Sequence, residues 1–160
     1  MGRIIVFTGK GGVGKTSIAA AHALRSARTG KKTILVSVDM AHNIGDMFRA
    51  PVGKDITKIE ENLWAVELDP YALMREDFPE AQKSVFDLIG GTKKNLDAIG
   101  SHFIIPGFEN LFSLLKIKQL YDDNTYDRII VDCAPTGETL SLLKLPELLS
   151  WYMEKFFPVG

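Results

Sequence analysis

Short apolar runs divide the chain into segments that are typical of β-strands. Residues 4–7, 33–38 and 128–132 are nearly continuous apolar runs rich in β-branched residues, the pattern of strands buried on both faces of a parallel sheet. Residues 63–68 alternate less regularly but also predict a strand. We therefore expect a small sheet of four strands.

A helical pattern lies between the first two predicted strands. Residues 16–28 predict a helix, and Gly30 is expected to end it, because glycine readily adopts the left-handed conformation that follows a helix C-terminus. Its small side chains, which allow close packing on a sheet, are Ala19, Ala20, Ala21, Ala23 and Ala27. Strand–helix–strand units with right-handed crossovers predict an α/β fold with a doubly wound, mostly parallel sheet.

Residues 70–123 carry a different pattern. Asp69 followed by Pro70 predicts a helix start, with aspartate as the cap and proline at the first helical position. Helical spacing is shared further along by Phe108, Leu111, Phe112 and Leu115. We predict a mainly helical insert over one edge of the sheet, within a single domain whose core comprises residues 1–69 and 124–160. The aromatic stripe of the insert is interpreted as core packing, with a partly exposed protein-binding face as the alternative.

The last residues of the sequence are unusually apolar. Pro146 predicts a new helix, whose last turns carry Leu148, Leu149, Trp151, Tyr152, Phe156 and Phe157. So much apolar surface at a chain end favours aggregation, and four strands make a small sheet for this architecture. We therefore expect the domain to be incomplete and truncated at its C-terminus.

Composition places the chain among ordinary globular proteins. It has 160 residues, a length that predicts one domain. Its net charge is −1 with 24% charged residues, so it lacks the basic excess of a nucleic-acid-binding protein and no nucleic acid partner is expected. Cys133 is the single cysteine, which excludes an internal disulfide and suits a reducing cytoplasm. No apolar run approaches the roughly 20 residues that span a bilayer. We expect a cytoplasmic protein without a membrane span.

Residues 9–16 read Gly-Lys-Gly-Gly-Val-Gly-Lys-Thr and fit the phosphate-binding loop G-x-x-x-x-G-K-[ST]. Glycines let the backbone wrap closely around a polyphosphate, and the loop N–H groups then form an anion-binding nest at the start of a helix. Lys15 is placed to reach the β- and γ-phosphates, and the Thr16 hydroxyl to ligate Mg²⁺. Lys10 is a second lysine inside the loop. The pattern predicts a P-loop NTPase whose nucleotide-binding core comprises residues 1–69 and 124–160.

The same loop also fits a competing pattern, because Gly9, Gly11 and Gly14 spell G-x-G-x-x-G. Asp39 follows a second apolar run, and the two features together approach the dinucleotide-binding fingerprint. A dinucleotide site has no use for the lysine and the hydroxyl that follow the last glycine, whereas a magnesium-bound triphosphate does. Asp132 ends a later apolar run, as in the strand that holds the Mg²⁺ shell. The sequence therefore favours the phosphate-binding loop.

Two further segments lie directly after predicted strands, where sensors of the γ-phosphate are expected. They are residues 39–46, Asp-Met-Ala-His-Asn-Ile-Gly-Asp, and residues 132–139, Asp-Cys-Ala-Pro-Thr-Gly-Glu-Thr, which continue to Glu147. Together with the loop, these segments resemble the arsenite-pump ATPase family, which includes ATPases that target tail-anchored membrane proteins. The resemblance covers most of the chain and implies the deviant phosphate-loop class, which also contains cell-division ATPases and nitrogenase iron protein.

The resemblance implies a role for each site residue. Lys10 would reach across a nucleotide-bound homodimer to the phosphates of the partner subunit, and Asp39 would orient or activate the attacking water. Thr16 would ligate Mg²⁺, Asp132 would hold a metal-bound water, and the Gly137 N–H would sense the γ-phosphate. The residues expected to bind ATP are Gly9, Lys10, Gly11, Gly12, Val13, Gly14, Lys15, Thr16, Ser17, Pro135 and Gly137.

These roles predict a Mg²⁺-dependent ATPase in which hydrolysis is coupled to opening and closing of the homodimer and to release of a cargo or partner. The alternative is a truncated or split nucleotide-binding adaptor that does not hydrolyse ATP, and a membrane-associated positioning ATPase is a third hypothesis. The cargo is left open between arsenite, a tail-anchored protein and a metal-cluster client. A membrane pump is a further candidate partner, which would place the protein peripherally at a membrane.

Three positions depart from the family's pattern. Met40, Cys133 and Glu138 stand where the family has Pro, Thr and His. The first substitution predicts a looser first switch, and the last leaves open how the nucleotide signals to the partner site. Cys133 is interpreted as a residue that packs at a strand end, with metalloid ligation as the alternative.

Overall fold

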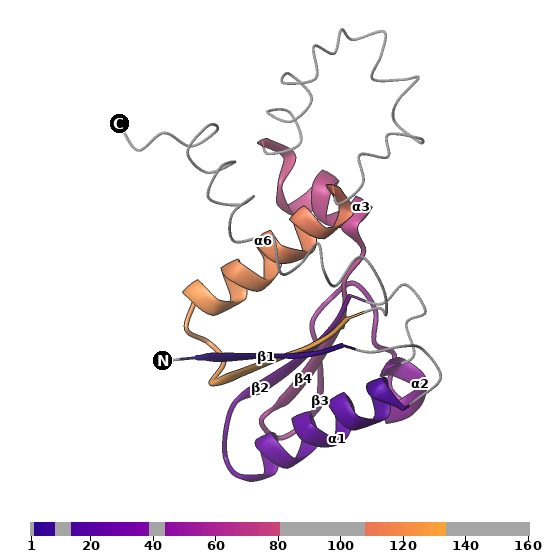
Figure 1. Cartoon of the computed structure of the whole chain (residues 1–160), viewed down its shortest axis with the longest axis vertical. Coiled ribbons are helices and arrows are strands. Elements are labelled where there is room, and N and C mark those ends of the chain that lie inside the picture. Colours follow the sequence, from indigo (N-terminus) through magenta and orange to yellow (C-terminus); the bar gives the residue numbers. More distant parts are fainter. Residues whose placement is uncertain (1, 9–13, 39–43, 81–107, 134–160) are drawn as a thin grey trace, which may run out of the picture.

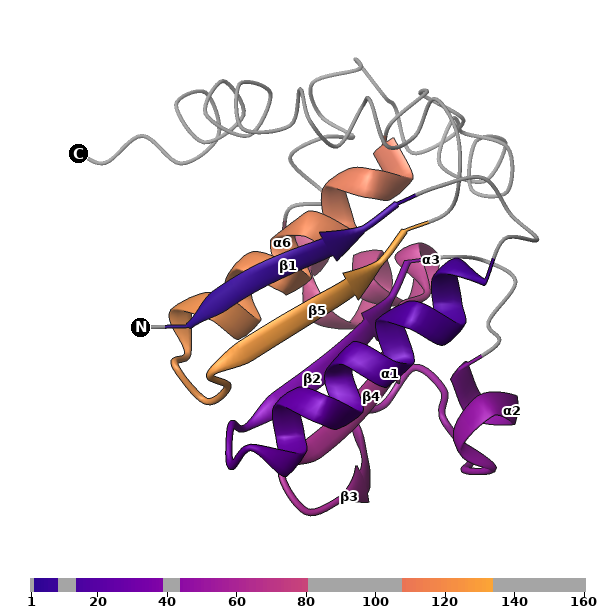
Figure 2. The ribbon, with the colours of Figure 1, turned by 60° about the horizontal axis from the view of Figure 1, so that its bottom comes forward.

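The computed structural model describes residues 2–8, 14–38, 44–80 and 108–133, and only the backbone of residues 108–111. Within these ranges, five strands form one sheet with helices on both of its faces (Figure 1, Figure 2). This arrangement confirms the predicted α/β fold with a doubly wound, mostly parallel sheet. No helix in the described ranges is both long and apolar enough to cross a membrane.

The strands follow the order β1-β5-β2-β4-β3 across the sheet. Their bounds are Arg3–Phe7 for β1, Thr33–Ser37 for β2, Thr57–Glu60 for β3, Leu63–Glu67 for β4 and Arg128–Asp132 for β5. β1, β5, β2 and β4 run parallel and match the four predicted strands, whereas β3 pairs antiparallel with β4. β3 was not predicted, since its four residues at the border of the sheet include a single large apolar side chain.

β5 is the last described strand in the sequence, yet it lies inside the sheet. It pairs with β1 on one side and with β2 on the other, and both pairings are parallel. Its central residues Ile129, Ile130 and Val131 are almost completely buried. A parallel strand covered on both faces must be apolar throughout, which explains the continuous run in the sequence. Asp132, at its end, therefore lies at the carboxyl edge of the sheet between β1 and β2.

Helix α1, Lys15–Arg28, covers one face of the sheet (Figure 2). Its buried row consists of Ala19, Ala20, Ala23 and Ala27. Ala21, which was expected in this row, is exposed because its position on the helix faces solvent. Gly30 ends the helix as predicted, with a φ of +88° and an N–H that donates to the Ala27 carbonyl at 3.0 Å.

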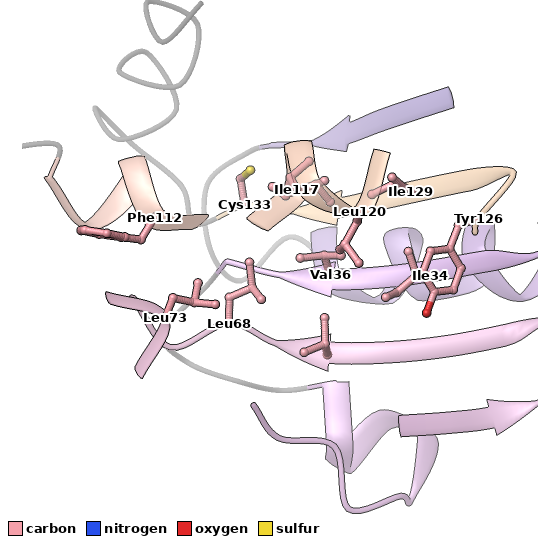
Figure 3. Close-up of a cluster of buried hydrophobic side chains, with 12 residues drawn as sticks. Ile34, Val36, Leu68, Leu73, Phe112, Ile117, Leu120, Tyr126, Ile129 and Cys133 are labelled. Atoms are coloured by element: carbon pink, nitrogen blue, oxygen red, sulfur yellow. The ribbon is translucent and has the colours of Figure 1, made fainter. Parts of the chain in front are cut away.

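Helix α6, Phe108–Asp122, covers the opposite face (Figure 2). Its side chains Phe112, Ile117 and Leu120 pack on apolar residues of β2, β4 and β5 (Figure 3). This helix was expected over an edge of the sheet, but it lies on a face because a parallel crossover from β4 to β5 must pass over one. Phe78 and Phe112 lie in contact within this cluster, with ring centroids 6.3 Å apart, which supports the core interpretation of the described part of the stripe.

Three short helical segments complete the described chain. They are α2, Ile44–Phe48, α3, Pro70–Ala72, and η1, a π-helical turn at Leu73–Asp77. Asp69 caps α3 as predicted, because its carboxylate accepts hydrogen bonds from the N–H groups of Tyr71 at 3.0 Å and Ala72 at 3.3 Å. α3 and η1 pack against α6, so they extend the same core beyond the end of β4.

Candidate functional site

The carboxyl ends of β1, β5 and β2 meet beside the start of α1 (Figure 2). Main-chain hydrogen bonds continue past the strand ends. The Cys133 N–H donates to the Phe7 carbonyl at 3.0 Å, and the Val38 N–H donates to the Asp132 carbonyl at 2.8 Å. These bonds fix the backbone on both sides of Asp132. In open parallel sheets, this edge is where ligands bind.

Gly14 begins α1 in a conformation that favours glycine. Its φ is +77° and its ψ 18°, in the left-handed region, and its carbonyl accepts a hydrogen bond from the Ile18 N–H at 2.9 Å. A glycine supplies no side-chain cap, and none is formed there. The N–H groups of a helix's first turn carry partial positive charge, so this helix start is suited to an anion.

The first two side chains of α1 converge on the end of β5. The Thr16 hydroxyl donates a hydrogen bond to Asp132 Oδ2 at 2.9 Å. Lys15 Nζ lies 2.7 Å from Asp132 Oδ1 and also donates to the Cys133 carbonyl. Residues that are 116 or more positions apart in the sequence thus form one charged cluster, which joins the start of α1 to the end of β5.

This cluster is buried. Asp132 is 1% exposed and Lys15 is 8% exposed. Buried charges require partners, and removing one member of such a pair typically costs about 3–5 kcal/mol because the other charge is left uncompensated. The ion pair therefore holds Lys15 and Asp132 in place and also concentrates cationic and anionic groups at the helix start.

The donor set of the cluster fits Mg²⁺ and phosphate. Asp132 Oδ1 contacts the ammonium as an ion pair, but no aligned hydrogen bond reaches it within the described structure, so this buried oxygen keeps capacity to accept one. A hydroxyl and a carboxylate side by side are the hard oxygen donors that Mg²⁺ prefers, and Mg²⁺ usually keeps several waters and few protein ligands. Accordingly, the described residues need not supply a cluster of three or more His, Cys, Asp or Glu ligands, and they contain none.

The structure brings together three of the predicted site residues, Lys15, Thr16 and Asp132. Gly14 lies directly before them, and Ser17 is described as an exposed residue of α1. Cys133 packs in the apolar cluster under α6, as interpreted from the sequence. The predicted residues outside the described ranges are Gly9, Lys10, Gly11, Gly12, Val13, Asp39, Pro135 and Gly137.

Glu67, at the end of β4, was not identified from the sequence. It is 8% exposed, lies beside Ser37 in the sheet, and its Oε1 accepts a hydrogen bond from the Gly45 N–H at 3.3 Å. Gly45 belongs to α2, which follows directly after residues 39–43 of the predicted first switch. The available signal was an acidic residue at the end of an apolar run, which Glu67 shares with Asp132.

Glu67 also borders an open cavity of about 450 Å³ beside α2. The cavity is lined by Gly45, Asp46, Arg49, Ala50, Val52 and Glu67. The mixed charge of this lining does not by itself select a ligand. The hydrogen bond from Gly45 to Glu67 joins the carboxyl edge of the sheet to the last residues of the predicted first switch, residues 39–46.

Comparison with known proteins gives the family. The family model described as anion-transporting ATPase matches residues 2–159. A protein of Prosthecochloris vibrioformis, provisionally named arsenical pump-driving ATPase, is 46% identical over 155 residues, which cover 95% of this chain and 38% of that relative. The protein named ATPase GET3 in Podospora anserina is 34% identical over 156 residues, 96% of this chain and 45% of the relative.

These matches extend over almost all of the chain but over less than half of each of these relatives. The matched region contains the phosphate-binding loop, Asp39 and Asp132, the residues on which the resemblance was based. The chain belongs to the anion-transporting ATPase family.

Proposed function

We propose that this chain is the nucleotide-binding part of a Mg²⁺-dependent ATPase. The observation that carries the proposal is the contact of Lys15 and Thr16 with Asp132, because it unites the lysine and hydroxyl of the phosphate loop with the carboxylate of the metal-binding strand. Relatives that carry ATPase in their names support the same activity. ATP and Mg²⁺ are the cofactors that this arrangement would hold.

Each residue of the cluster has a definable task in phosphoryl transfer. The Thr16 hydroxyl would bind Mg²⁺, and the Asp132 carboxylate would orient a water of its shell. The Lys15 ammonium, which Asp132 and the Cys133 carbonyl hold at the helix start, would turn to the β- and γ-phosphates. When bound, Mg²⁺ neutralises charge that develops on the phosphate oxygens. The protein's contribution is therefore position and electrostatics, which dominate this class of reaction.

The remaining roles belong to residues outside the described ranges. Asp39 would orient the attacking water, and the Gly137 N–H would sense the γ-phosphate. Lys10 would reach the phosphates of a partner subunit, where a cation of the arginine-finger kind accelerates transfer on the order of 10³–10⁵-fold. A homodimer that closes on nucleotide would couple hydrolysis to the release of a cargo or partner.

ATP hydrolysis measured against protein concentration tests the proposal, with Lys10→Ala as the comparison. A rate that rises with the square of the concentration and disappears in Lys10→Ala would support a catalytic homodimer. A rate that is proportional to concentration and unchanged in Lys10→Ala would contradict it. Lys15→Ala is expected to abolish ATP binding, and a wild-type affinity in this variant would refute the proposed site itself.

The second candidate is a nucleotide-binding adaptor without hydrolysis, because the contact of Lys15 and Thr16 with Asp132 accounts equally well for nucleotide binding alone. Asp39→Asn distinguishes the two functions. If the variant binds ATP but has lost the wild-type turnover, the protein is an enzyme. If wild type and variant both bind ATP and neither turns it over, the adaptor function is supported.

The name of the Prosthecochloris relative points to a membrane pump as the partner. We include this partner in the proposal, with a tail-anchored protein as the alternative cargo. Either partner would bring a protein of the cytoplasm to a membrane surface. Flotation with vesicles that contain an arsenical pump, compared with vesicles that contain a tail-anchored protein, separates the two partners.

A further inference from the structure

Glu67 lies in the same row of the sheet as Asp132. Ser37 is the register partner of Asp132 on one side and of Glu67 on the other. Partners in a parallel register project from the same face of the sheet, and Lys15 of α1 contacts Asp132, so this is the face that α1 covers. All three side chains are buried, since Asp132 and Ser37 are 1% exposed and Glu67 is 8% exposed. Glu67 is thus a second buried carboxylate in the row that carries the site.

Glu67 holds two points of the segment that leads from β2 to β3. Its Oε1 accepts a hydrogen bond from the Gly45 N–H at 3.3 Å, and its own N–H donates to the Gly53 carbonyl at 2.8 Å. Within this segment the Gly45 carbonyl accepts from the Ala50 N–H at 3.0 Å. A Cβ at position 45 would lie 3.1 Å from the Ala50 carbonyl oxygen, so glycine permits this close turn. Residues 45–53 are therefore tied at both ends to one residue of β4.

Gly45 lies near the end of the predicted first switch, residues 39–46. Directly before the switch, the Val38 N–H donates to the Asp132 carbonyl at 2.8 Å. The switch is thus anchored on both sides, by the main chain of Asp132 before it and by the side chain of Glu67 near its end. Fixing both ends of a short segment reduces the number of conformations that it can adopt. The Glu67 contact is therefore placed to restrict the switch.

The contact requires an oxygen acceptor at the end of a side chain of this length. A carboxylate that accepts from a main-chain N–H forms a charge-assisted hydrogen bond, roughly twice as strong as a neutral one. Glutamine keeps an acceptor oxygen, whereas alanine leaves the Gly45 N–H without it. Both Gly45 and Glu67 line the open cavity of about 450 Å³, so water can reach this N–H once the carboxylate is removed. Substitution of Glu67 can therefore weaken the contact or abolish it.

We propose that Glu67 is a positioning residue of the ATPase reaction. Through Gly45 it holds the end of the first switch, whose first residue, Asp39, is proposed above to orient the attacking water. The phosphates are assigned to Lys15 and Thr16, so Glu67 acts on the hydrolysis step and not on ATP binding. This inference rests on the proposed function, and it adds a residue that neither contacts a phosphate nor belongs to a motif.

ATP hydrolysis by the whole chain at one protein concentration tests this role, together with ATP affinity from isothermal titration. Glu67→Ala is expected to lower kcat about tenfold or more and to leave the Kd for ATP within about twofold of wild type, because a small misplacement of a reacting group is costly. Glu67→Gln should recover most of kcat, since its amide oxygen can accept from Gly45.

Val66→Ala is the matched control. Val66 precedes Glu67 on β4 and is 1% exposed, but it belongs to the cluster under α6. This variant should lose stability and keep the kcat of wild type, and circular dichroism checks that all variants are folded. Equal losses of kcat in Glu67→Ala and Val66→Ala would overturn the inference, because Glu67 would then act only through the stability of the fold.

The outcomes also separate this inference from the function on which it rests. Wild-type protein without turnover would contradict the proposed ATPase and this role with it. Wild-type turnover that Glu67→Ala leaves unchanged would overturn the inference alone. A loss of kcat in Glu67→Ala with an equal loss of ATP affinity would do the same, because Glu67 would then belong to nucleotide binding.

Hydrogen exchange tests the contact itself and needs no turnover. The Gly45 amide should exchange faster in Glu67→Ala than in wild type, and Glu67→Gln should lie close to wild type. The Leu68 amide, which donates to the Ser37 carbonyl at 2.9 Å, is the reference and should exchange alike in all variants. A Gly45 amide whose exchange is unchanged in Glu67→Ala would show that the carboxylate does not hold the switch and would overturn the inference.

Discussion

Helices α1 and α6 cover opposite faces of one sheet, but they do so with different side chains. α1 buries a row of alanines, whereas α6 buries Phe112, Ile117 and Leu120. Small side chains allow a helix backbone to approach a sheet closely, and large ones fill a wider space with apolar surface. Both faces are thus covered by a helix, but one helix packs with small side chains and the other with large ones.

The difference follows from what each helix carries. The first turn of α1 holds Lys15 and Thr16, which must meet Asp132 at the end of β5. Close packing on the alanine row brings that turn to the sheet, where Thr16 and Lys15 contact Asp132. α6 contributes none of the three site residues, and its large side chains pack into the apolar core on their side of the sheet. One face positions the site, and the other stabilises the fold.

The largest expected effect is on the α6 face. Phe112→Ala should lower the free energy of unfolding by about 3–5 kcal/mol, because it removes a fully buried ring and leaves a cavity. Urea denaturation measures the change, with the exposed Ile18→Ala as a control that should stay within about 0.5 kcal/mol of wild type. A loss below about 1 kcal/mol in Phe112→Ala would show that this face is loosely packed.

On the α1 face, overpacking should affect both stability and the site. Ala23→Leu forces α1 away from the sheet and should cost about 1–3 kcal/mol, and it should also weaken ATP binding because the helix start moves. Ala21→Leu is the control on the same helix, since Ala21 is exposed. Isothermal titration of ATP into the folded variants tests the comparison. Equal affinity in both variants would mean that the alanine row does not position the site.

A substitution at Gly14 measures the cost of backbone strain at the start of α1 apart from the cost of packing. Gly14→Ala places a side chain at φ +77° and should cost about 1–2 kcal/mol, although a Cβ there would meet no atom within 4 Å. Gly53→Ala is the matched control, because that site is equally open and lacks a left-handed φ. Thermal unfolding of both variants should give opposite or clearly different shifts. An equal shift of the unfolding temperature in both variants would show that the cost at Gly14 does not come from its left-handed backbone conformation.

The smallest effect is a pH dependence on the α6 face. Burial raises the pKa of Tyr126, whose ring meets Trp64 edge-on at 5.5 Å. The neutral phenol is thus favoured in the fold, so its contribution is complete below the unfolded pKa of about 10 and is lost as the pH rises through the higher folded pKa. Urea midpoints from pH 8 to 11 should fall less steeply in Tyr126→Phe. The exposed Tyr71→Phe should follow wild type, and a matching slope in both variants would contradict the effect.

Local pattern was sufficient to predict the elements whose environment is uniform. β5 and β2 are buried on both faces, so their sequences are continuous apolar runs, and α1 is bounded by the phosphate loop and Gly30. β3 was missed because a border strand needs few apolar residues. The predicted position of α6 was wrong because this position depends on the strand order. No local sequence pattern predicts that β5 lies between β1 and β2.

The site shows the same division. Lys15, Thr16 and Asp132 were predicted because the phosphate-loop motif and an apolar run that ends in aspartate can be recognised from residue type and spacing. Their contact in space depends on the sheet order, which the structure supplies. Glu67 was missed because a single carboxylate at a strand end has no motif, and its bond to Gly45 joins positions 22 apart.

The interior position of β5 also determines when the protein can fold during translation. β1 leaves the ribosome first, but its pairing partner β5 begins at Arg128, so β1 must wait for nearly the whole described chain. β2 and β4 are far closer in sequence and can pair early. Until β5 enters between them, β1 and β2 have no contact within the sheet, and the apolar run of β1 is open to aggregation. Synthesis slowed before residue 128 would prolong that exposure, and a chaperone that binds nascent chains would be needed longest at β1.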